Sequence, residues 1–115
     1  MLLVVSLFTV KDRETREFFV RSLRRGGSWQ STAHRIAPQM LNFEKLEHLD
    51  DGAGAPYLCL ELWMSAEAYY SACQSPEIQS LFLARRQLAD SSFELGAFAY
   101  SATPDTGDTT PPSVN

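Results

Sequence analysis

The sequence predicts an α+β domain in which helices cover one face of a four-stranded antiparallel sheet. Segments of β character and helical character follow one another as strand, helix, strand, strand, helix, strand. The 115 residues are enough for one domain with one core. A hydrophobic content of 44%, a charged content of 21% and a net charge of -4 are ordinary for a globular domain. The order of elements is that of the ferredoxin-like βαββαβ fold.

The first half of the chain contains a strand and two helices before the second strand. Residues 2–10 form an apolar, β-prone run with both alternating sets of side chains largely apolar, which indicates a strand covered on both faces. A helix is expected over residues 12–25, with Asp12 as N-cap and a glycine pair as its end. Ser28 is expected to cap a short helix that stops before Pro38.

The second half contains the remaining three strands. Residues 40–49 have β character with broken alternation, which predicts a strand with a bulge or with one end unpaired, and residues 51–54 supply a turn. Residues 57–64 alternate strictly. Ser65 caps a helical segment that is capped again at Ser75 and runs to about residue 90, and residues 93–100 form the last strand. The alternation in the third strand sets Leu58, Leu60, Leu62 and Met64 on one face against Tyr57, Cys59, Glu61 and Trp63 on the other.

The domain boundary follows from a change of composition after Tyr100. We expect one folded domain over residues 1–100 and a disordered tail over residues 101–115, since that stretch is rich in proline, threonine and aspartate. Helices can cover only one face of the sheet, so the other apolar face predicts a homodimer.

Several functional classes are disfavoured by what the sequence lacks. It has no concentrated basic face for nucleic acid and no apolar run long enough to span a membrane. The apolar N-terminal run lacks the flanks of a signal peptide, so a cytoplasmic protein is expected. Cys59 and Cys73 have no metal-ligand spacing and are expected to be free thiols. No metal and no cofactor are expected, because no binding fingerprint is present.

A local pattern resembles a known family. The segments Leu-Glu-Leu-Trp over residues 60–63, Ser-Ala-Glu-Ala-Tyr over residues 65–69 and Ser-Pro-Glu-Ile-Gln-Ser-Leu-Phe over residues 75–82 resemble the strand-to-helix signature of the antibiotic biosynthesis monooxygenases. This resemblance implies a dimeric α+β barrel and oxygenation without a cofactor. In the haem-degrading branch of the superfamily the ligating histidine would fall near Phe82, which cannot ligate iron, so haem chemistry is disfavoured.

Four residues are candidates for a site. Arg85 falls in the middle of the apolar stripe of its helix, so its stem either packs while the guanidinium reaches water, or the guanidinium enters a cavity. Glu61 is its natural partner, because the resemblance places its strand face toward that cavity, and it is either half of a structural ion pair or a general base. Trp63 is either a core residue or a ring that stacks on a ligand, and Tyr69 is a candidate for the pocket wall.

Two histidines are weaker candidates for a base. His34 falls on the polar side of its helix and His48 at a strand end, and both are expected to be solvated.

Two hypotheses follow for function. The first is a cofactor-independent monooxygenase acting on a small phenolic or quinol-like compound, with Arg85 and Glu61 as catalytic residues and Trp63 and Tyr69 as ligand-binding residues. Its logic is that a base removes a substrate proton and a cation stabilises the resulting oxyanion while dioxygen is reduced. The second is a non-catalytic dimeric module that binds a small hydrophobic ligand or a protein partner. An enclosed cavity containing Arg85 and Glu61 would favour the first.

Overall fold

The computed structural model describes residues 1–48 and 55–99. The expected turn over residues 51–54 and the expected tail over residues 101–115 lie outside the described residues, as does Tyr100 at the proposed domain boundary. Within the described part of the chain, no helix is long and apolar enough to cross a membrane.

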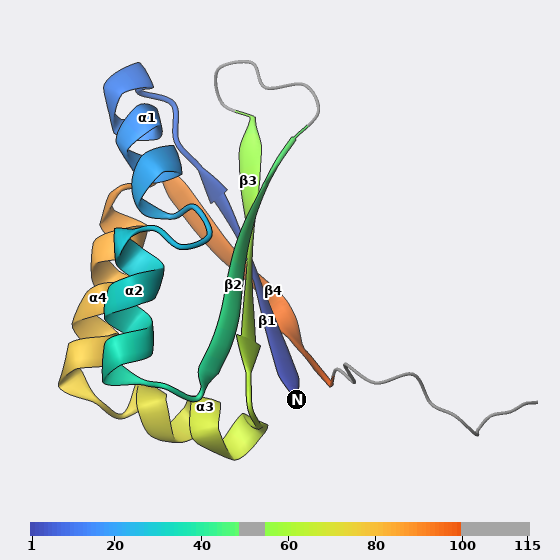
Figure 1. Cartoon of the computed structure of the whole chain (residues 1–115). Helices are drawn as coiled ribbons and strands as arrows, with labels where there is room; N and C mark the ends of the chain where they lie inside the picture. The colour runs from blue at the N-terminus through green and yellow to red at the C-terminus, as the bar shows by residue number, and fades with distance from the viewer. Residues whose placement is uncertain (49–54, 100–115) are drawn as a thin grey trace, which may run out of the picture.

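The structure has the predicted α+β architecture, with a layer of helices on one face of an antiparallel sheet (Figure 1). The strands lie in the order β2-β3-β1-β4, and each neighbouring pair is antiparallel. Two helices follow β1, as predicted, and the helical segment predicted after β3 is divided into two helices at Ser75, where the second cap was expected. The elements are β1 (Leu2–Thr9), α1 (Arg13–Ser22), α2 (Ser28–Ile36), β2 (Met40–Glu47), β3 (Pro56–Trp63), α3 (Ala66–Cys73), α4 (Pro76–Gln87) and β4 (Ser91–Ala99).

The helices begin at capping residues, with one correction to the prediction. Asp12, Ser65 and Ser75 accept hydrogen bonds from backbone amides of the first turns of α1, α3 and α4, as their sequence positions indicate. Helix α2 is capped by Gly27, and Ser28 is its first residue. A Cβ atom at Gly27 would lie 2.8 Å from the carbonyl oxygen of Ser22, so only glycine fits the tight turn between α1 and α2.

The core lies between the sheet and the helix layer. Strand β3 alternates between buried and half-buried residues along its whole length, so the face that carries Glu61 and Trp63 points toward the helices, as predicted. Phe8 on β1, Phe19 on α1 and Phe43 on β2 pack in the same core and are almost completely buried. This core fixes the direction in which the polar groups of β3 face.

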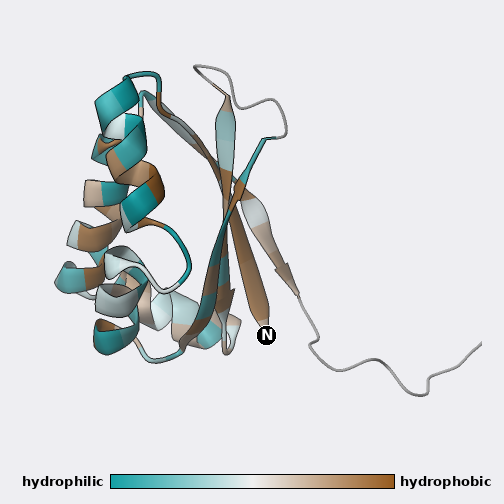
Figure 2. Cartoon of the chain, turned by 45° about the horizontal axis from the view of Figure 1, so that its top comes forward, coloured by the Kyte–Doolittle hydropathy of each residue, from teal (hydrophilic) through white to brown (hydrophobic). Residues whose placement is uncertain are grey.

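The outer face of the sheet is apolar and is covered by no described element. Leu3, Leu7, Leu58, Leu60 and Leu62 lie on this face and are only half-buried, and Figure 2 shows that β1 is hydrophobic over most of its length. Phe93 and Phe98 on β4 pair with Leu7 and Leu3 and are 60% and 52% exposed. Such a patch on a small domain indicates an interaction surface.

Two strands contain irregularities. The register of β2 shifts between Met40 and Asn42, which confirms the predicted bulge in that strand. A second shift occurs where Val5 pairs with Gly96 and Ser6 pairs with Glu94. Leu95 is therefore an extra residue in β4, and this bulge changes which residues of β4 face the helices.

Candidate functional site

A buried ion pair joins the helix layer to the sheet. Arg85 comes from α4 and Glu61 from β3, and the Arg85 Nη1 and Glu61 Oε2 atoms are 2.5 Å apart. The two side chains are only 7% and 2% exposed. The charge of each group offsets the cost of burying the other, which explains how both are accommodated in a small core.

Three aromatic rings surround the guanidinium of Arg85. Its central carbon lies 4.5 Å from the ring centroid of Trp29 and 5.1 Å from those of Phe8 and Phe82. Trp29 is held in place from α2 because its Nε1 donates to the carbonyl oxygen of Leu81 on α4, at 3.2 Å. Ring faces attract a cation that is shielded from water, so the cage stabilises the charge of Arg85 and fixes its plane.

The Arg85 guanidinium is held more by charge than by aligned hydrogen bonds. Arg85 Nε and Nη1 are buried, and neither has a hydrogen-bond partner among the described residues, although Nη1 is in ionic contact with Glu61. Buried donors are normally paired, so each exception calls for an explanation. Because Arg85 lines the pocket, its guanidinium presents a positive charge to a ligand there.

Trp63 lies behind Glu61. The indole Nε1 of Trp63 donates to Glu61 Oε1 at 3.0 Å, and the ring is completely buried with an edge contact to Tyr69. Trp63 therefore orients the carboxylate and supports the Tyr69 ring. The stacking of Trp63 on a ligand stays a prediction. Its hydrogen bond to Glu61 favours a role in positioning that carboxylate.

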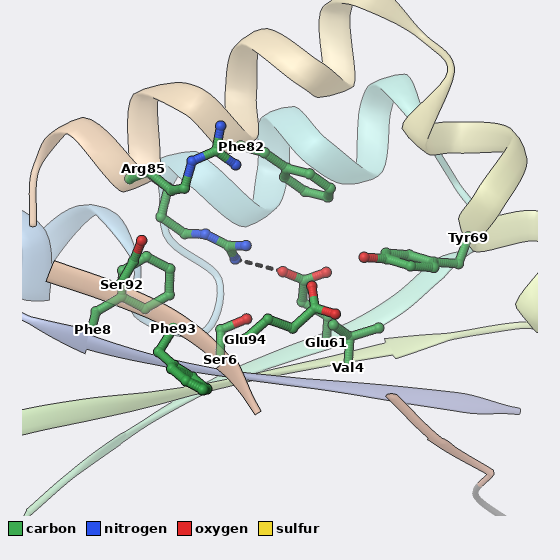
Figure 3. Close-up of a pocket in the computed structure, with 11 residues that line it drawn as sticks. Val4, Ser6, Phe8, Glu61, Tyr69, Phe82, Arg85, Ser92, Phe93 and Glu94 are labelled. Atoms are coloured by element: carbon green, nitrogen blue, oxygen red, sulfur yellow. Dashed lines mark ion pairs between the residues drawn. The ribbon is translucent and has the colours of Figure 1, made fainter. Parts of the chain in front are cut away.

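A pocket of about 100 Å³ opens beside the ion pair, between the sheet and α3 and α4. Figure 3 shows Arg85, Phe82 and Tyr69 on one side, with Glu61, Ser6 and Glu94 rising from the strands. The lining residues are Val4, Ser6, Phe8, Glu61, Tyr69, Phe82, Arg85, Arg86, Ser92, Phe93 and Glu94. Of the four sequence candidates the pocket contains Arg85, Glu61 and Tyr69.

Sequence reasoning missed the contribution of β4 to the pocket. Simple alternation places Glu94 on the same face as Phe98, which is the outer face. The extra residue at Leu95 turns Glu94 toward the helices instead, opposite Ser6. Gly96, with a φ of +149°, was the available signal, because a glycine inside a strand often marks a bulge.

The Tyr69 hydroxyl is a neutral hydrogen-bonding group at the pocket wall. Burial raises the pKa of Tyr69 well above its usual range, with smaller contributions from Cys73, Glu94 and Glu61. The phenol therefore stays protonated over the whole neutral range. It can donate a hydrogen bond to a ligand without becoming charged.

Replacing Tyr69 with phenylalanine is expected to make the stability of the protein less sensitive to alkaline pH. In the unfolded chain the phenol ionises near pH 10.0, whereas the folded protein keeps it protonated at higher pH. The stability that the neutral phenol contributes is complete below that pH and is lost as pH rises toward the folded pKa. The loss is at most about 1.4 kcal/mol per pH unit and smaller for a half-buried group. Urea unfolding from about pH 9 to about pH 11 measures it, and equal slopes for the two proteins would contradict it.

The two histidines and the two cysteines of the chain do not line this pocket. His34 is exposed, with its Nδ1 atom 2.9 Å from the carbonyl oxygen of Met40, and neither His34 nor the exposed His48 lines the pocket. Cys59 and Cys73 are free, and burial raises the pKa of the Cys59 thiol to about 12. Among residues 1–48 and 55–99, no three histidine, cysteine or acidic side chains gather in a way that could hold a metal ion.

Solved structures with this arrangement of helices and strands come from several organisms. A single-residue variant of SnoaB, a cofactor-independent oxygenase from Streptomyces nogalater, is 22% identical with a TM-score of 0.64, over 90% of this chain and 95% of that chain. A candidate antibiotic biosynthesis monooxygenase from Deinococcus radiodurans is 16% identical with a TM-score of 0.64, over the same shares. A hydroxynitrile lyase from Passiflora edulis is 13% identical with a TM-score of 0.61, over 89% and 95%.

These similarities establish the fold. It is the fold of the antibiotic biosynthesis monooxygenases, as the local sequence resemblance implied. No protein-family model matches the sequence, and no curated protein matches it. Because an oxygenase and a lyase share the fold, the activity of this chain has to be argued from its own pocket.

Proposed function

We propose that the protein is a cofactor-independent monooxygenase that oxidises a small phenolic or quinol-like compound with dioxygen. The observation that carries this proposal is the buried, charged guanidinium of Arg85, which lines an aromatic-walled pocket. A substrate that becomes an oxyanion gains from a fixed cation in a dry site, and the gain is larger in the transition state than in the ground state. SnoaB, which has the same fold, is a cofactor-independent oxygenase, and this supports the proposed reaction.

The roles of the pocket residues follow from their contacts. Arg85 stabilises the oxygen of the ionised substrate, and Glu61 holds Arg85 in place through the ion pair. Tyr69 donates a hydrogen bond from the wall, and Phe82 gives a flat apolar surface against which a ring can pack. The pocket volume of about 100 Å³ suits a single aromatic ring, with larger ring systems extending through the open side.

The reaction balances with dioxygen as the oxidant. A carboxylate takes the phenolic proton, and the phenolate transfers one electron to dioxygen. Recombination forms a carbon–oxygen bond at the ring carbon para to the hydroxyl. The resulting peroxide anion takes a proton, and loss of the hydrogen on that ring carbon then breaks the O–O bond and releases water. One quinone and one water form from one phenol and one dioxygen, with four electrons transferred in total.

Dioxygen uptake tests this function. Hydroxyquinol, naphthol and dithranol are offered to the purified protein without added flavin, haem or metal, and quinone formation is followed by absorbance. We expect uptake above the autoxidation rate with one quinone per dioxygen. The double variant Arg85→Met/Glu61→Leu is the control and should lose about 100- to 1,000-fold in kcat/KM. Uptake at the background rate for every compound would overturn the proposal in favour of a non-catalytic binding module.

We also propose that the protein is a homodimer in which the outer faces of two sheets meet. The support is the half-buried leucine row of β1 and β3 together with exposed Phe93 and Phe98. Burying this patch removes apolar side chains from water on both copies at once, and a self-complementary face suits a two-fold interface.

A further inference from the structure

Strand β4 brings a second carboxylate to the pocket. Glu94 pairs with Ser6, Ala97 with Val4 and Ser92 with Phe8, so these β4 residues share the face that points to the helices. Glu94 reaches this face only because of the bulge at Leu95. Figure 3 shows the side chains of Glu94 and Glu61 pointing into the same space from β4 and β3.

The carboxylates of Glu61 and Glu94 differ in their hydrogen-bond and ion-pair partners. Glu61 is almost completely buried, with one oxygen in contact with Arg85 and the other accepting from Trp63. Glu94 lies at the exposed side of the pocket, and its carboxylate has no ion pair or hydrogen bond with any described residue. A carboxylate that already holds a cation and an indole N–H is a poor proton acceptor, whereas an unpaired one at a pocket mouth is free to act.

We propose that Glu94 is the general base of this site and that Glu61 is a positioning residue for Arg85. This proposal rests on the proposed oxygenase function and assigns its first proton transfer. A substrate hydroxyl between Arg85 and Glu94 gives its proton to the Glu94 carboxylate while its oxygen accepts a hydrogen bond from the guanidinium. Glu94 then returns the proton to the peroxide anion, so it ends the cycle ionised.

The surroundings of Glu94 include several charged and titratable groups. Strand β1 presents only Val4, Ser6 and Phe8 to the pocket, which carry no charge. The groups that face it from the other elements are Glu61 on β3, Tyr69 and Cys73 on α3, and Arg85 and Arg86 on α4. Tyr69 and Cys73 stay neutral because burial raises the pKa of each.

The first test compares Glu94→Gln with wild type on whichever phenol of the panel is consumed. We expect kcat/KM to fall at least about 100-fold and the acid limb of its pH profile to disappear, because an amide cannot accept the proton. Glu67→Gln is the matched control, since Glu67 is an exposed carboxylate of α3 outside the pocket. Thermal melting of all three proteins should agree. A wild-type rate and pH profile in Glu94→Gln would overturn this proposal and leave the oxygenase function standing.

The second test needs no turnover and uses 4-nitrophenol, whose phenolate absorbs visible light. In mildly acidic buffer we expect wild type and Glu67→Gln to bind the probe with phenolate absorbance and to release no proton to the buffer, because Glu94 takes it. Glu94→Gln should also bind the phenolate, since removing a negative charge favours it, but it should release about one proton per bound probe to the buffer. Titration calorimetry in two buffers that differ in ionisation enthalpy counts the released protons. Equal proton release by wild type and Glu94→Gln, or no phenolate absorbance with wild type, would overturn the proposal. The result decides the role of Glu94 even where no panel compound is oxidised.

Discussion

Replacing Arg85 with methionine will destabilise the fold by about 3 to 5 kcal/mol, because the Glu61 carboxylate is then buried without its counter-charge. The variant also loses the contacts of the guanidinium with the rings of Trp29, Phe8 and Phe82. A domain of this size has a total stability of about 5 to 15 kcal/mol, so the change is a large part of the whole. Urea unfolding followed by circular dichroism measures it.

A double variant separates the charge effect from the loss of packing. Arg85→Met combined with Glu61→Leu removes both charges and keeps apolar volume, and we expect it to recover most of the lost stability. Arg85→Lys keeps the charge but loses the planar guanidinium that the rings surround, so an intermediate stability is expected. If the double variant were no more stable than Arg85→Met alone, unpaired charge on Glu61 would not be the cause.

Sequence patterns were sufficient to predict which residues of β3 and α4 face the core. Strict alternation in β3 places Glu61 toward the helices, and the helical period of α4 places Arg85 in its buried stripe. These two inferences depend only on local geometry, and the antiparallel sheet then brings both residues to the same core. The caps at Asp12, Ser65 and Ser75 were predictable for the same reason, since each bond joins residues three positions apart.

Features that depend on tertiary contacts were not predictable in this way. The hydrogen bond from Trp63 to Glu61 depends on the rotamers that the packed core selects for the two side chains, which periodicity does not specify. Glu94 was missed because one extra residue in a strand reverses the facing of every residue on one side of it. Position 27, the observed cap of α2, takes glycine because the backbone of the preceding turn leaves no room for a side chain, and periodicity does not show this contact.

Replacing Leu60 with glutamate will convert the proposed homodimer into a monomer. Leu60 lies on β3, an inner strand of the sheet, and its backbone neighbours are Val5 on β1 and Glu44 on β2. Its side chain is therefore near the centre of the outer face. In a two-fold interface the substitution buries an unpaired carboxylate on each copy, at a cost of at least about 3 kcal/mol, which raises the dissociation constant about 100-fold or more.

The mass of the protein in solution checks this expectation. Light scattering coupled to gel filtration at micromolar protein should give a dimer for wild type and a monomer for Leu60→Glu. Leu83→Glu is the matched control, because Leu83 is an exposed leucine on α4, in the helix layer away from the outer face, and its substitution should leave the dimer intact. A monomeric wild type would exclude the homodimer. A dimeric Leu60→Glu would place the contact on another surface, because a buried, unpaired charge at the centre of the interface is incompatible with tight association.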